Sequence, residues 1–419
     1  MTGRTLQPTY DMDRSWLSAS LILSTLACVG GGDPSLYVAQ TVVESPAGPD
    51  SGEPFLATDG ERVYLSWLEA ADDDHHELKM ARLESDGWGA PTMIARSDRF
   101  FVNWADFPSL TPGPDGTLWA HWLQRGAAGG YDYAVRIAHS RDGGKAWSDP
   151  VTLHEDDSPT EHGFVSTFVQ DDGVGFVWLD GRRYAAGPDG EPASQEMTLR
   201  YRFVGVDGSM RAETLLDGRV CDCCQTSSAV TSEGPVAVYR DRSPHEIRDI
   251  YITRLRDGAW TEGSPVHEDG WEIGGCPVNG PAVAARGTEV AVAWFTGAGN
   301  VARVKVAFSQ DAGATFGEPI VVDDGNPEGR VDLLLGEDGS AYVSWLERTG
   351  GEAAEVRLRS VRPDGGASAS APLVRSSAGR PSGFPRMVAR GEGDVILAWT
   401  DLEGAAPQVR VARLELENE

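Results

Sequence analysis

The sequence has few basic residues and no long apolar segment. Only 36 Lys and Arg stand against 64 Asp and Glu in 419 residues, which gives a formal net charge of −28. A protein this acidic lacks the cations that neutralise phosphates, so we expect no nucleic-acid partner. No apolar run reaches the roughly 20 residues that a membrane-spanning helix needs, and no stretch of useful length shows helical periodicity. These absences favour an acidic protein built from strands.

Cysteine is also scarce, and one of the five cysteines ends a segment typical of an export signal. Arg14 precedes the apolar run 16–26, which is followed by Ala27 and Cys28. The sequence Thr25-Leu-Ala-Cys28 resembles a bacterial lipoprotein box, which implies lipidation of Cys28. We therefore expect a lipoprotein-type signal peptide over 1–27, a linker over 28–35 and a folded domain over 36–419. The predicted location is the periplasm or cell surface of a bacterium, with a lipid anchor as the only membrane contact. An ordinary signal peptide is the alternative.

What the sequence has in abundance is glycine, with 50 residues, and tryptophan, with 13. This combination is typical of short strands joined by tight turns. An apolar strand that ends in an aromatic residue recurs along the chain, at 63–67, 118–122, 174–178, 236–239, 290–294, 342–345 and 395–399. Successive terminal aromatics are 55, 56, 61, 55, 51 and 54 residues apart. A fixed period of this length indicates a repeat architecture.

Each repeat reads as four strands joined by hairpins, which is one blade of a β-propeller. The last repeat stops after its third strand, at 409–414, while an unassigned strand at 39–43 precedes the first repeat. Pairing these two strands closes the ring and removes exposed sheet edges. The sequence therefore predicts an all-β, seven-bladed propeller whose N-terminal strand completes the last blade. Six blades are the alternative if one repeat is irregular.

Two hairpins between third and fourth strands carry a shared pattern of Ser, Asp, Gly and an aromatic residue. In such a turn the Asp side chain accepts backbone N–H bonds, and Gly takes a positive φ. The pattern resembles the Asp box, or bacterial neuraminidase repeat, and the chain resembles the sialidase-like propeller superfamily. The structural residues implied are Ser140, Asp142, Gly144 and Trp147 in one turn and Ser309, Asp311, Gly313 and Phe316 in the other.

Four cysteines lie at the starts of the first strands of two neighbouring repeats, where propeller topology places variable loops on one face. Cys221, Cys223 and Cys224 open the fourth repeat, and Cys276 opens the fifth. In an extended strand, Cys221 and Cys223 would point to one side and Cys224 to the other. Proximity in an oxidising compartment favours disulfides. Thiolates grouped with His162 would instead suit Cu(I) or Zn(II) as a cofactor, so both interpretations stay open.

An active sialidase would need three arginines that hold a carboxylate, a Tyr–Glu nucleophile pair and an aspartic acid, as the resemblance implies. The Arg-Ile-Pro segment of that family is missing, and the corresponding strand reads Glu53-Pro-Phe-Leu56. By position alone, the catalytic candidates are Asp106, His162, Arg182, Arg242, Arg330 and Arg380, with Asp332, Arg386, Tyr131 and Tyr133 as further polar groups on the same face.

These patterns favour an exported propeller with a cysteine-rich site that binds a metal or a small ligand. An exo-α-sialidase-like hydrolase and a disulfide-braced interaction scaffold are the alternatives, so the sequence leaves open whether the protein is an enzyme. If it is one, a sialidase-type hydrolase and a metal-dependent redox enzyme are the two expectations. We expect a small-molecule or glycan ligand and a monomeric chain.

Overall fold

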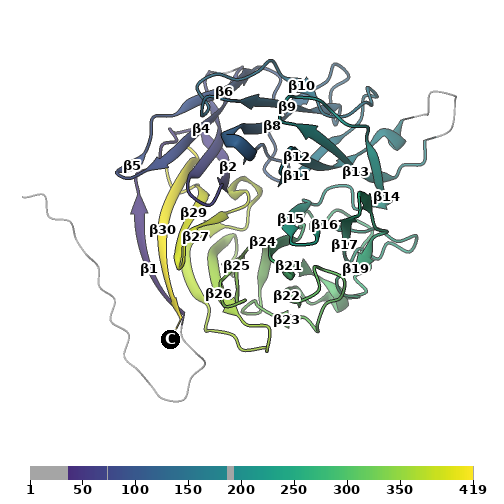
Figure 1. The fold of residues 1–419 in the computed structure, drawn as a ribbon. Coiled ribbons are helices and arrows are strands. Elements are labelled where there is room, and N and C mark those ends of the chain that lie inside the picture. Colours follow the sequence, from purple (N-terminus) through teal and green to yellow (C-terminus); the bar gives the residue numbers. More distant parts are fainter. Residues whose placement is uncertain (1–35, 73, 186–192, 419) are drawn as a thin grey trace, which may run out of the picture. The chain divides into compact units, whose positions relative to one another are not determined.

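The repeat of apolar strands along the chain folds into seven antiparallel sheets arranged in a ring, a seven-bladed β-propeller (Figure 1). The computed structural model describes residues 36–72, 74–185 and 193–418. The chain divides into two units, Met1–Gly32 and Asp33–Glu419, and the described residues all belong to the second. The predicted signal peptide, the linker and Cys28 lie outside the described residues.

Blades one to three follow one another along the first half of the chain. Blade one contains β2 Ser51–Thr58, β3 Val63–Ala70, β4 His76–Glu84, β5 Gly87–Trp88 and β6 Thr92–Ser97. Blade two contains β7 Ser109–Pro112, β8 Leu118–Arg125, β9 Tyr133–Ser140 and β10 Val151–Thr152. Blade three contains β11 His162–Gln170, β12 Gly173–Asp180, β13 Met197–Gly205 and β14 Thr214–Val220.

Blades four to six repeat the same order. Blade four contains β15 Ser227–Thr231, β16 Gly234–Arg240, β17 Ile250–Arg256, β18 Ala259–Trp260 and β19 Ser264–Pro265. Blade five contains β20 Ala282–Arg286, β21 Glu289–Thr296, β22 Arg303–Ser309 and β23 Ile320–Val321. Blade six contains β24 Pro327–Leu335, β25 Ala341–Gly350, β26 Ala353–Val361 and β27 Ala371–Ser377.

Blade seven joins the two ends of the described chain, as the sequence predicts. It contains β28 Arg386–Gly391, β29 Asp394–Asp401, β30 Gln408–Asn418 and β1 Leu36–Val43. Strand β1 pairs antiparallel with β30, with Gln40 opposite Leu414 and Val43 opposite Val411. The first strands of neighbouring blades contact one another in a closed series, β2, β7, β11, β15, β20, β24, β28 and again β2. The ring is therefore closed by backbone pairing within one sheet.

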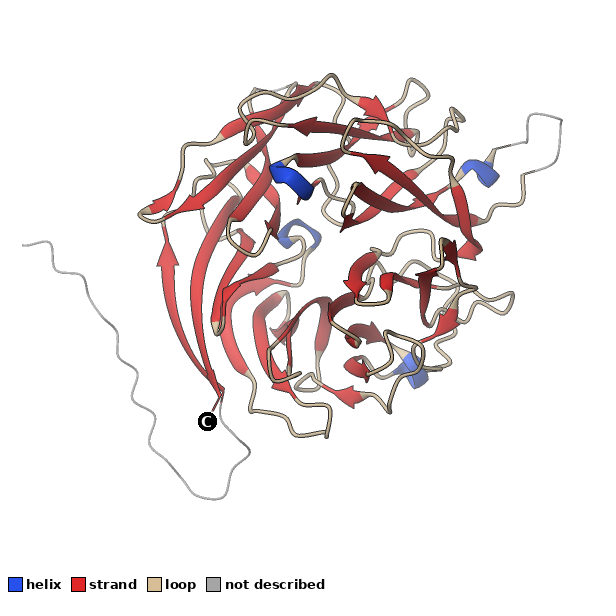
Figure 2. Cartoon of the chain, in the orientation of Figure 1, coloured by secondary structure: helices blue, strands red, loops and turns tan. Residues whose placement is uncertain are grey.

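Helical structure in the described residues is limited to 3-10 turns, which lie in loops between strands (Figure 2). They are η1 Pro114–Gly116, η2 Arg182–Tyr184, η3 Ala298–Asn300 and η4 Arg380–Ser382. Among the described residues, no helix is long and apolar enough to cross a membrane.

The core consists of apolar layers between adjacent blades, and the recurring aromatic residue lies inside them. Trp67 and Trp178 are 0% exposed, and Trp294 and Trp345 are 1% exposed. An acidic residue two positions further along the strand accepts the indole N–H in three blades, at 3.0 Å for Trp67 with Glu69, 3.0 Å for Trp178 with Asp180 and 2.6 Å for Trp345 with Glu347. Satisfying this donor removes the cost of burying it unpaired.

The two Ser-x-Asp-x-Gly turns have the hydrogen bonds that their residues predict. Asp142 accepts the backbone N–H of Lys145 and Ala146 at 3.0 and 2.9 Å, and Gly144 donates to Ser140 Oγ at 2.9 Å with a φ of +89°. In the second turn Asp311 accepts the N–H of Thr315 at 2.8 Å, and Gly313 donates to Ser309 Oγ at 2.9 Å. The aromatic residue of each turn packs against the core between two blades: Trp147 against blades one and two, and Phe316 against blades four and five.

The starts of several first strands are irregular, and residues beside these irregularities, such as Phe55 and Phe164, line a cavity. The pairing register shifts between Gly52 and Phe55 in β2 and between Gly163 and Ser166 in β11. Glu53 and Phe164 have φ values of +50° and +52° in these two segments. A bulge of this kind redirects the side chains that follow it, and strained backbone of this type concentrates at ligand sites.

Candidate functional site

The two cysteine segments meet at the rim between blades four and five. Cys221 follows the last residue of β14, and Cys276 lies in the connection between β19 and β20. Cys223 and Cys276 form a disulfide whose Cα atoms are 6.0 Å apart. The expectation that neighbouring repeats bring these cysteines together is confirmed. The four cysteines are nonetheless divided, because Cys221 and Cys224 are free thiols.

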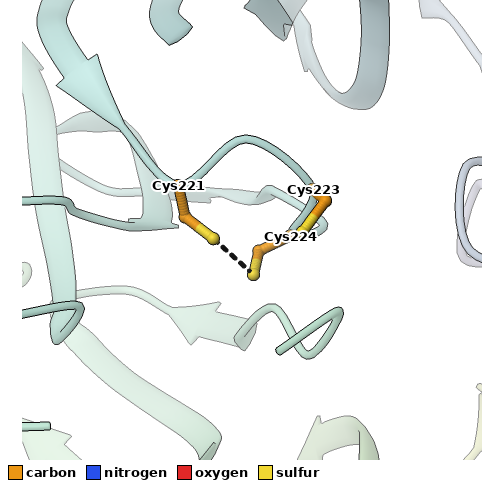
Figure 3. A group of neighbouring side chains, drawn as sticks. All are labelled: Cys221, Cys223 and Cys224. Carbon is orange, nitrogen blue, oxygen red and sulfur yellow. Dashed lines mark hydrogen bonds between the residues drawn. The ribbon is translucent and has the colours of Figure 1, made fainter. Parts of the chain in front are cut away.

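The local backbone around the cysteines differs from the extended strand that the sequence suggested. Residues 222 and 223 form a turn, and β15 begins only at Ser227. The turn brings the sulfurs of Cys221 and Cys224 to 2.9 Å (Figure 3), although an extended strand would point them to opposite sides. The prediction of strand geometry was wrong here because a turn, with Cys221 N–H bonded to Arg240 O at 3.0 Å, ends the ladder.

Burial separates the four sulfurs into an inner and an outer pair. Cys221 is 0% exposed and Cys224 is 2% exposed. Cys223 is half-buried and Cys276 is exposed. The Sγ atoms of Cys221, Cys223 and Cys224 all lie within 4.8 Å of one another. One sulfur of the disulfide, that of Cys223, therefore lies next to both sulfurs of a buried dithiol.

Two residues hold this segment against the channel wall. The side chain of Gln225 donates to Ala105 O at 2.6 Å and accepts the N–H of Gly280 at 2.9 Å. Thr226 Oγ1 donates to Phe164 O at 2.8 Å. A Cβ on Gly280 would lie 2.1 Å from Gln225 O, so only glycine allows the two loops to approach this closely.

Positive charge lies directly beside the inner pair. Arg248 Nη1 donates to Cys221 Sγ at 3.4 Å, and its Nη2 donates to Glu246 at 2.8 Å. Arg240, 2% exposed, donates to the carbonyl oxygens of Arg248, Asn279 and Phe295 at 2.6 to 3.1 Å. It thereby ties the two cysteine loops to the end of β21.

The electrostatic environment makes the two thiols of the inner pair unequal. Burial would raise the pKa of Cys221, but the hydrogen bond with Cys224 and the charges of Arg240 and Arg248 lower it to about 6. Burial and the neighbouring thiolate raise the pKa of Cys224 well above its usual value. The pair therefore carries one proton at neutral pH, with Cys221 as the thiolate, which is the reactive and metal-binding form.

His162 lies in a different polar cluster from the cysteines. Its Nε2 is 2.9 Å from Asp156 Oδ2, and its Nδ1 is 3.0 Å from Thr160 O. Its ring stacks on His154 with centroids 3.8 Å apart. Among the described residues, the ligand atoms of His162, Asp156 and Asp180 lie within 4.8 Å of one another, so His162 could share an ion with these two carboxylates. The structure therefore groups the four cysteines but does not bring His162 among them.

A second polar cluster lies at the channel wall beside blades two and three. The Tyr133 hydroxyl lies 2.6 Å from Glu161 Oε1 and 3.0 Å from Asp106 Oδ2, and Asp106 Oδ1 accepts the N–H of Phe164 at 2.7 Å. Burial raises the pKa of Glu161 to about 7 and that of Asp106 well above its usual value. Tyr131, in contrast, is 67% exposed. The sequence placed Glu161 at the start of a first strand on this face but did not make it a catalytic candidate.

The cavity beside this cluster is small. It has a volume of about 160 Å³ and includes Asp106, Phe107, Asp332 and Arg386 in its wall. Arg386 lies 3.7 Å from Asp332 and over the ring of Phe107. Pockets for drug-sized ligands usually measure about 300–1,000 Å³, so this cavity suits only a small molecule.

Three of the four candidate arginines each bind a different set of groups within the protein. Arg182 pairs with Asp180 and Glu213 at 2.6 and 2.8 Å, and Arg242 pairs with Glu246 and Asp222 at 2.9 and 3.3 Å. Arg330 is 3% exposed and donates to Ser382 Oγ and to the carbonyl oxygens of Ala378, Gly379 and Gly383 at 2.6 to 3.0 Å. Arg380 is exposed on η4. Three of these four guanidinium groups are thus already bound within the protein.

Comparison with known proteins supports the fold. No protein-family model matches the sequence, and no curated protein matches it either. The polysaccharide lyase Uly1 superposes with a TM-score of 0.51 at 11% identity, over 88% of this chain and 90% of the lyase. A puromycin-hydrolysing peptidase of Mycobacterium tuberculosis superposes with a TM-score of 0.50 at 13% identity, over 86% of this chain and 51% of the peptidase.

A sialidase of Trypanosoma rangeli superposes less well, with a TM-score of 0.46 at 10% identity, over 79% of this chain and 57% of the sialidase. The chain therefore spans little more than half the length of the peptidase and of the sialidase. At such identities the likeness describes the propeller fold alone.

Proposed function

We propose that this protein is an exported, lipid-anchored propeller of the sialidase-like superfamily that binds one cuprous ion between Cys221 and Cys224. The observation that carries the proposal is the buried pair of free thiols, 2.9 Å apart, at the rim of the channel. Thiolates are soft ligands, which favour Cu(I) and zinc over hard ions such as magnesium and calcium.

The number of available ligands favours copper over zinc. A structural Zn(II) site takes four ligands from Cys, His or carboxylate side chains. Here the disulfide occupies Cys223 and Cys276, and the metal-ligating group around Cys221 and Cys224 contains no histidine or carboxylate among the described residues. Two thiolates are sufficient for a two-coordinate cuprous ion, so the candidate cofactor narrows from copper or zinc to Cu(I).

The surrounding charge also fits this assignment. Two thiolates and one Cu(I) together carry a net charge of −1, and Arg248 lies 3.4 Å from Cys221 Sγ. Burying an anion is favourable only when a cation or hydrogen bonds compensate it. The two sulfurs are 2.9 Å apart and must move apart to admit an ion, because a two-coordinate ion lies between its two sulfur ligands and metal–sulfur bonds are about 2.3 Å long.

Anaerobic titration of the full chain with Cu(I), in competition with a coloured cuprous chelator, tests the proposal. We expect one tightly bound ion per chain and its loss in Cys221→Ser and in Cys224→Ser. Cys28→Ser removes the fifth cysteine and serves as the matched control, with copper binding retained. Undiminished copper binding in the Cys221→Ser and Cys224→Ser double variant would refute the site, as would a failure of the native chain to compete.

The disulfide favours a second candidate, a braced interaction scaffold. Cys223–Cys276 joins the loops that open two neighbouring blades, which would fix a binding face. This candidate predicts a native chain that binds no metal and keeps its ligand affinity when Cys221 and Cys224 are both replaced by serine.

Glycoside hydrolysis draws less support from the site. Three of the four candidate arginines, Arg182, Arg242 and Arg330, are bound to other groups of the protein. The channel cavity is only about 160 Å³. A fluorogenic sialoside assay is the direct test, and turnover that Arg386→Ala abolishes would favour the hydrolase.

A further inference from the structure

The geometry points to a thiol–disulfide relay in which the buried Cys221 and Cys224 reduce the outer Cys223–Cys276 disulfide and, through it, an external disulfide. The relay itself needs no metal, and only its consequence for copper rests on the proposed function. Three observations carry it: the placement of the sulfurs, their graded burial and their division into one dithiol and one disulfide.

The sulfur of Cys223 belongs to the outer disulfide and also lies close to the inner pair. Its sulfur is bonded to that of Cys276 and lies within 4.8 Å of the sulfurs of Cys221 and Cys224. A thiolate attacks a disulfide sulfur through a mixed-disulfide intermediate, so exchange requires a neighbouring thiol at short range. Cys221 is separated from Cys223 by one residue, which avoids the strained vicinal link that Cys224 and Cys223 would form.

The exchange is balanced within the protein. The Cys221 thiolate attacks Cys223 Sγ, forms a Cys221–Cys223 bond and releases the Cys276 thiolate. Cys224 gives its proton to solvent and attacks Cys221 Sγ, which forms Cys221–Cys224 and releases the Cys223 thiolate. Cys276 takes up a proton from solvent. Two electrons have then moved from the inner pair to the outer pair, and no bond or proton is gained or lost overall.

Burial gives the relay its direction. The inner thiols are 0% and 2% exposed, so an external molecule cannot reach them directly. Cys276 is exposed, and Cys223 is half-buried. The reduced outer pair can therefore attack an external disulfide, R–S–S–R′, which becomes two thiols while Cys223–Cys276 forms again. The substrate class is a disulfide of a small thiol or of an exposed protein loop.

The relay also sets the metal-binding state. Once Cys221 and Cys224 are joined, neither offers a thiolate, so a bound cuprous ion would be released. The outer disulfide is thus the direct oxidant of the inner pair, and the external disulfide then oxidises the outer pair again. This consequence requires the proposed copper site, whereas the exchange among the four sulfurs does not.

The test detects the release of Cys276 without any added reductant. Metal-free full-length protein is incubated anaerobically with a maleimide that caps exposed thiols, and peptide mapping follows the capping of Cys276 over time. We expect steady capping of Cys276 in the native chain. In Cys224→Ser the exchange stops after its first step, so we expect a capped Cys276 together with a Cys221–Cys223 disulfide.

Cys221→Ser is the matched variant, because it lacks the attacking sulfur and keeps the outer disulfide. We expect at least a tenfold slower capping of Cys276, with an unchanged unfolding midpoint as the check on folding. Equal capping rates in Cys221→Ser and the native chain would overturn the relay, and so would the absence of capping in the native chain. Copper binding that persists alongside either result would leave the proposed function standing.

Oxidised glutathione serves as the probe for the external step. We expect the native chain to release two equivalents of reduced glutathione per chain and to end with two disulfides. Cys221→Ser should release none by this route. If both proteins released equal amounts of reduced glutathione, Cys221 and Cys224 would not be the source of the electrons.

Discussion

The guanidinium of Arg248 lies 3.4 Å from the sulfur of Cys221, inside the rim between two blades. Arg248 is 3% exposed and Cys221 is 0% exposed, so water screens this contact little. The second donor of Arg248 is held by Glu246 at 2.8 Å, which fixes the guanidinium in place. Arg248 therefore joins Cys224 and Arg240 in lowering the pKa of this thiol.

Replacing Arg248 by glutamine should make Cys221 a weaker acid. The pKa of Cys221 is about 6 because the hydrogen bond with Cys224 and the charges of Arg240 and Arg248 outweigh burial. Without Arg248 we expect this pKa to rise, because one of the two cations that stabilise the thiolate is removed. Thiolate absorbance at 240 nm, followed against pH, measures it. Arg286→Gln, at an exposed arginine of β20, is the control and should leave the titration unchanged.

Replacing Cys276 by serine should destabilise the propeller. The Cys223–Cys276 bond joins residues 53 positions apart. A loop of that length contributes about 2–4 kcal/mol, largely by restricting the unfolded chain. Urea unfolding of Cys276→Ser should therefore give a free energy lower by this amount, and reduction of the native chain should produce the same loss. An unchanged free energy of unfolding in both cases would mean that the Cys223–Cys276 disulfide does not stabilise the fold.

The sequence predicted the architecture because each blade repeats the same local physics. The aromatic residue near the end of every second strand occurs at a nearly constant period, and these residues are buried between blades. The pairing of β1 with β30 was predictable because one unpaired strand remained at each end of the repeat. The order of the strands and the closure of the ring follow from this repeat and from its two unpaired terminal strands.

The chemistry of the site was less predictable, because it depends on contacts between loops. A strand reading of residues 221–224 placed Cys221 and Cys224 on opposite sides, whereas a turn brings them together. Nothing in the spacing of Arg248 indicates that it reaches Cys221, 27 positions earlier. Arg330 was assigned to the near face by position, and its partners around η4 could not be read from the repeat.

Replacing Arg330 by methionine should destabilise the protein and leave no selective effect on an anionic ligand. The guanidinium donates to three carbonyl oxygens and one hydroxyl, all in the segment 378–383. Among the described residues, removing it takes the only side-chain donor from the buried carbonyl oxygens of Ala378 and Gly383, whereas Gly379 O and the Ser382 hydroxyl keep a hydrogen bond with each other. We expect a loss of about 3 kcal/mol, since each unsatisfied group costs roughly 1–3 kcal/mol.

The matched control for that variant is Arg380→Met, at an exposed arginine of the same segment. Surface substitutions of this kind usually change stability by no more than about 0.5 kcal/mol. Urea unfolding compares the two. A stable Arg330→Met protein that has lost affinity for sialic acid would show instead that Arg330 holds a ligand carboxylate.

Glu161 should make the protein less stable as the pH rises. Burial raises the pKa of Glu161 from its usual 4.5 to about 7, and the hydrogen bond from Tyr133 offsets only part of that effect. Between these two values the folded chain holds a proton that the unfolded chain has lost, so raising the pH through this window favours unfolding. A shift of this size corresponds to a loss on the order of 3 kcal/mol between pH 4.5 and pH 7.

Glu161→Gln keeps an oxygen that accepts the Tyr133 hydroxyl, and it cannot ionise. We therefore expect the free energy of unfolding of this variant to fall less steeply than that of the native chain between pH 4.5 and pH 7. His162, whose pKa is also raised, loses its contribution only as the pH rises above 6.5. Glu352→Gln, at an exposed site, is the control. Parallel pH profiles for all three proteins would mean that Glu161 ionises as freely in the folded chain as in the unfolded one.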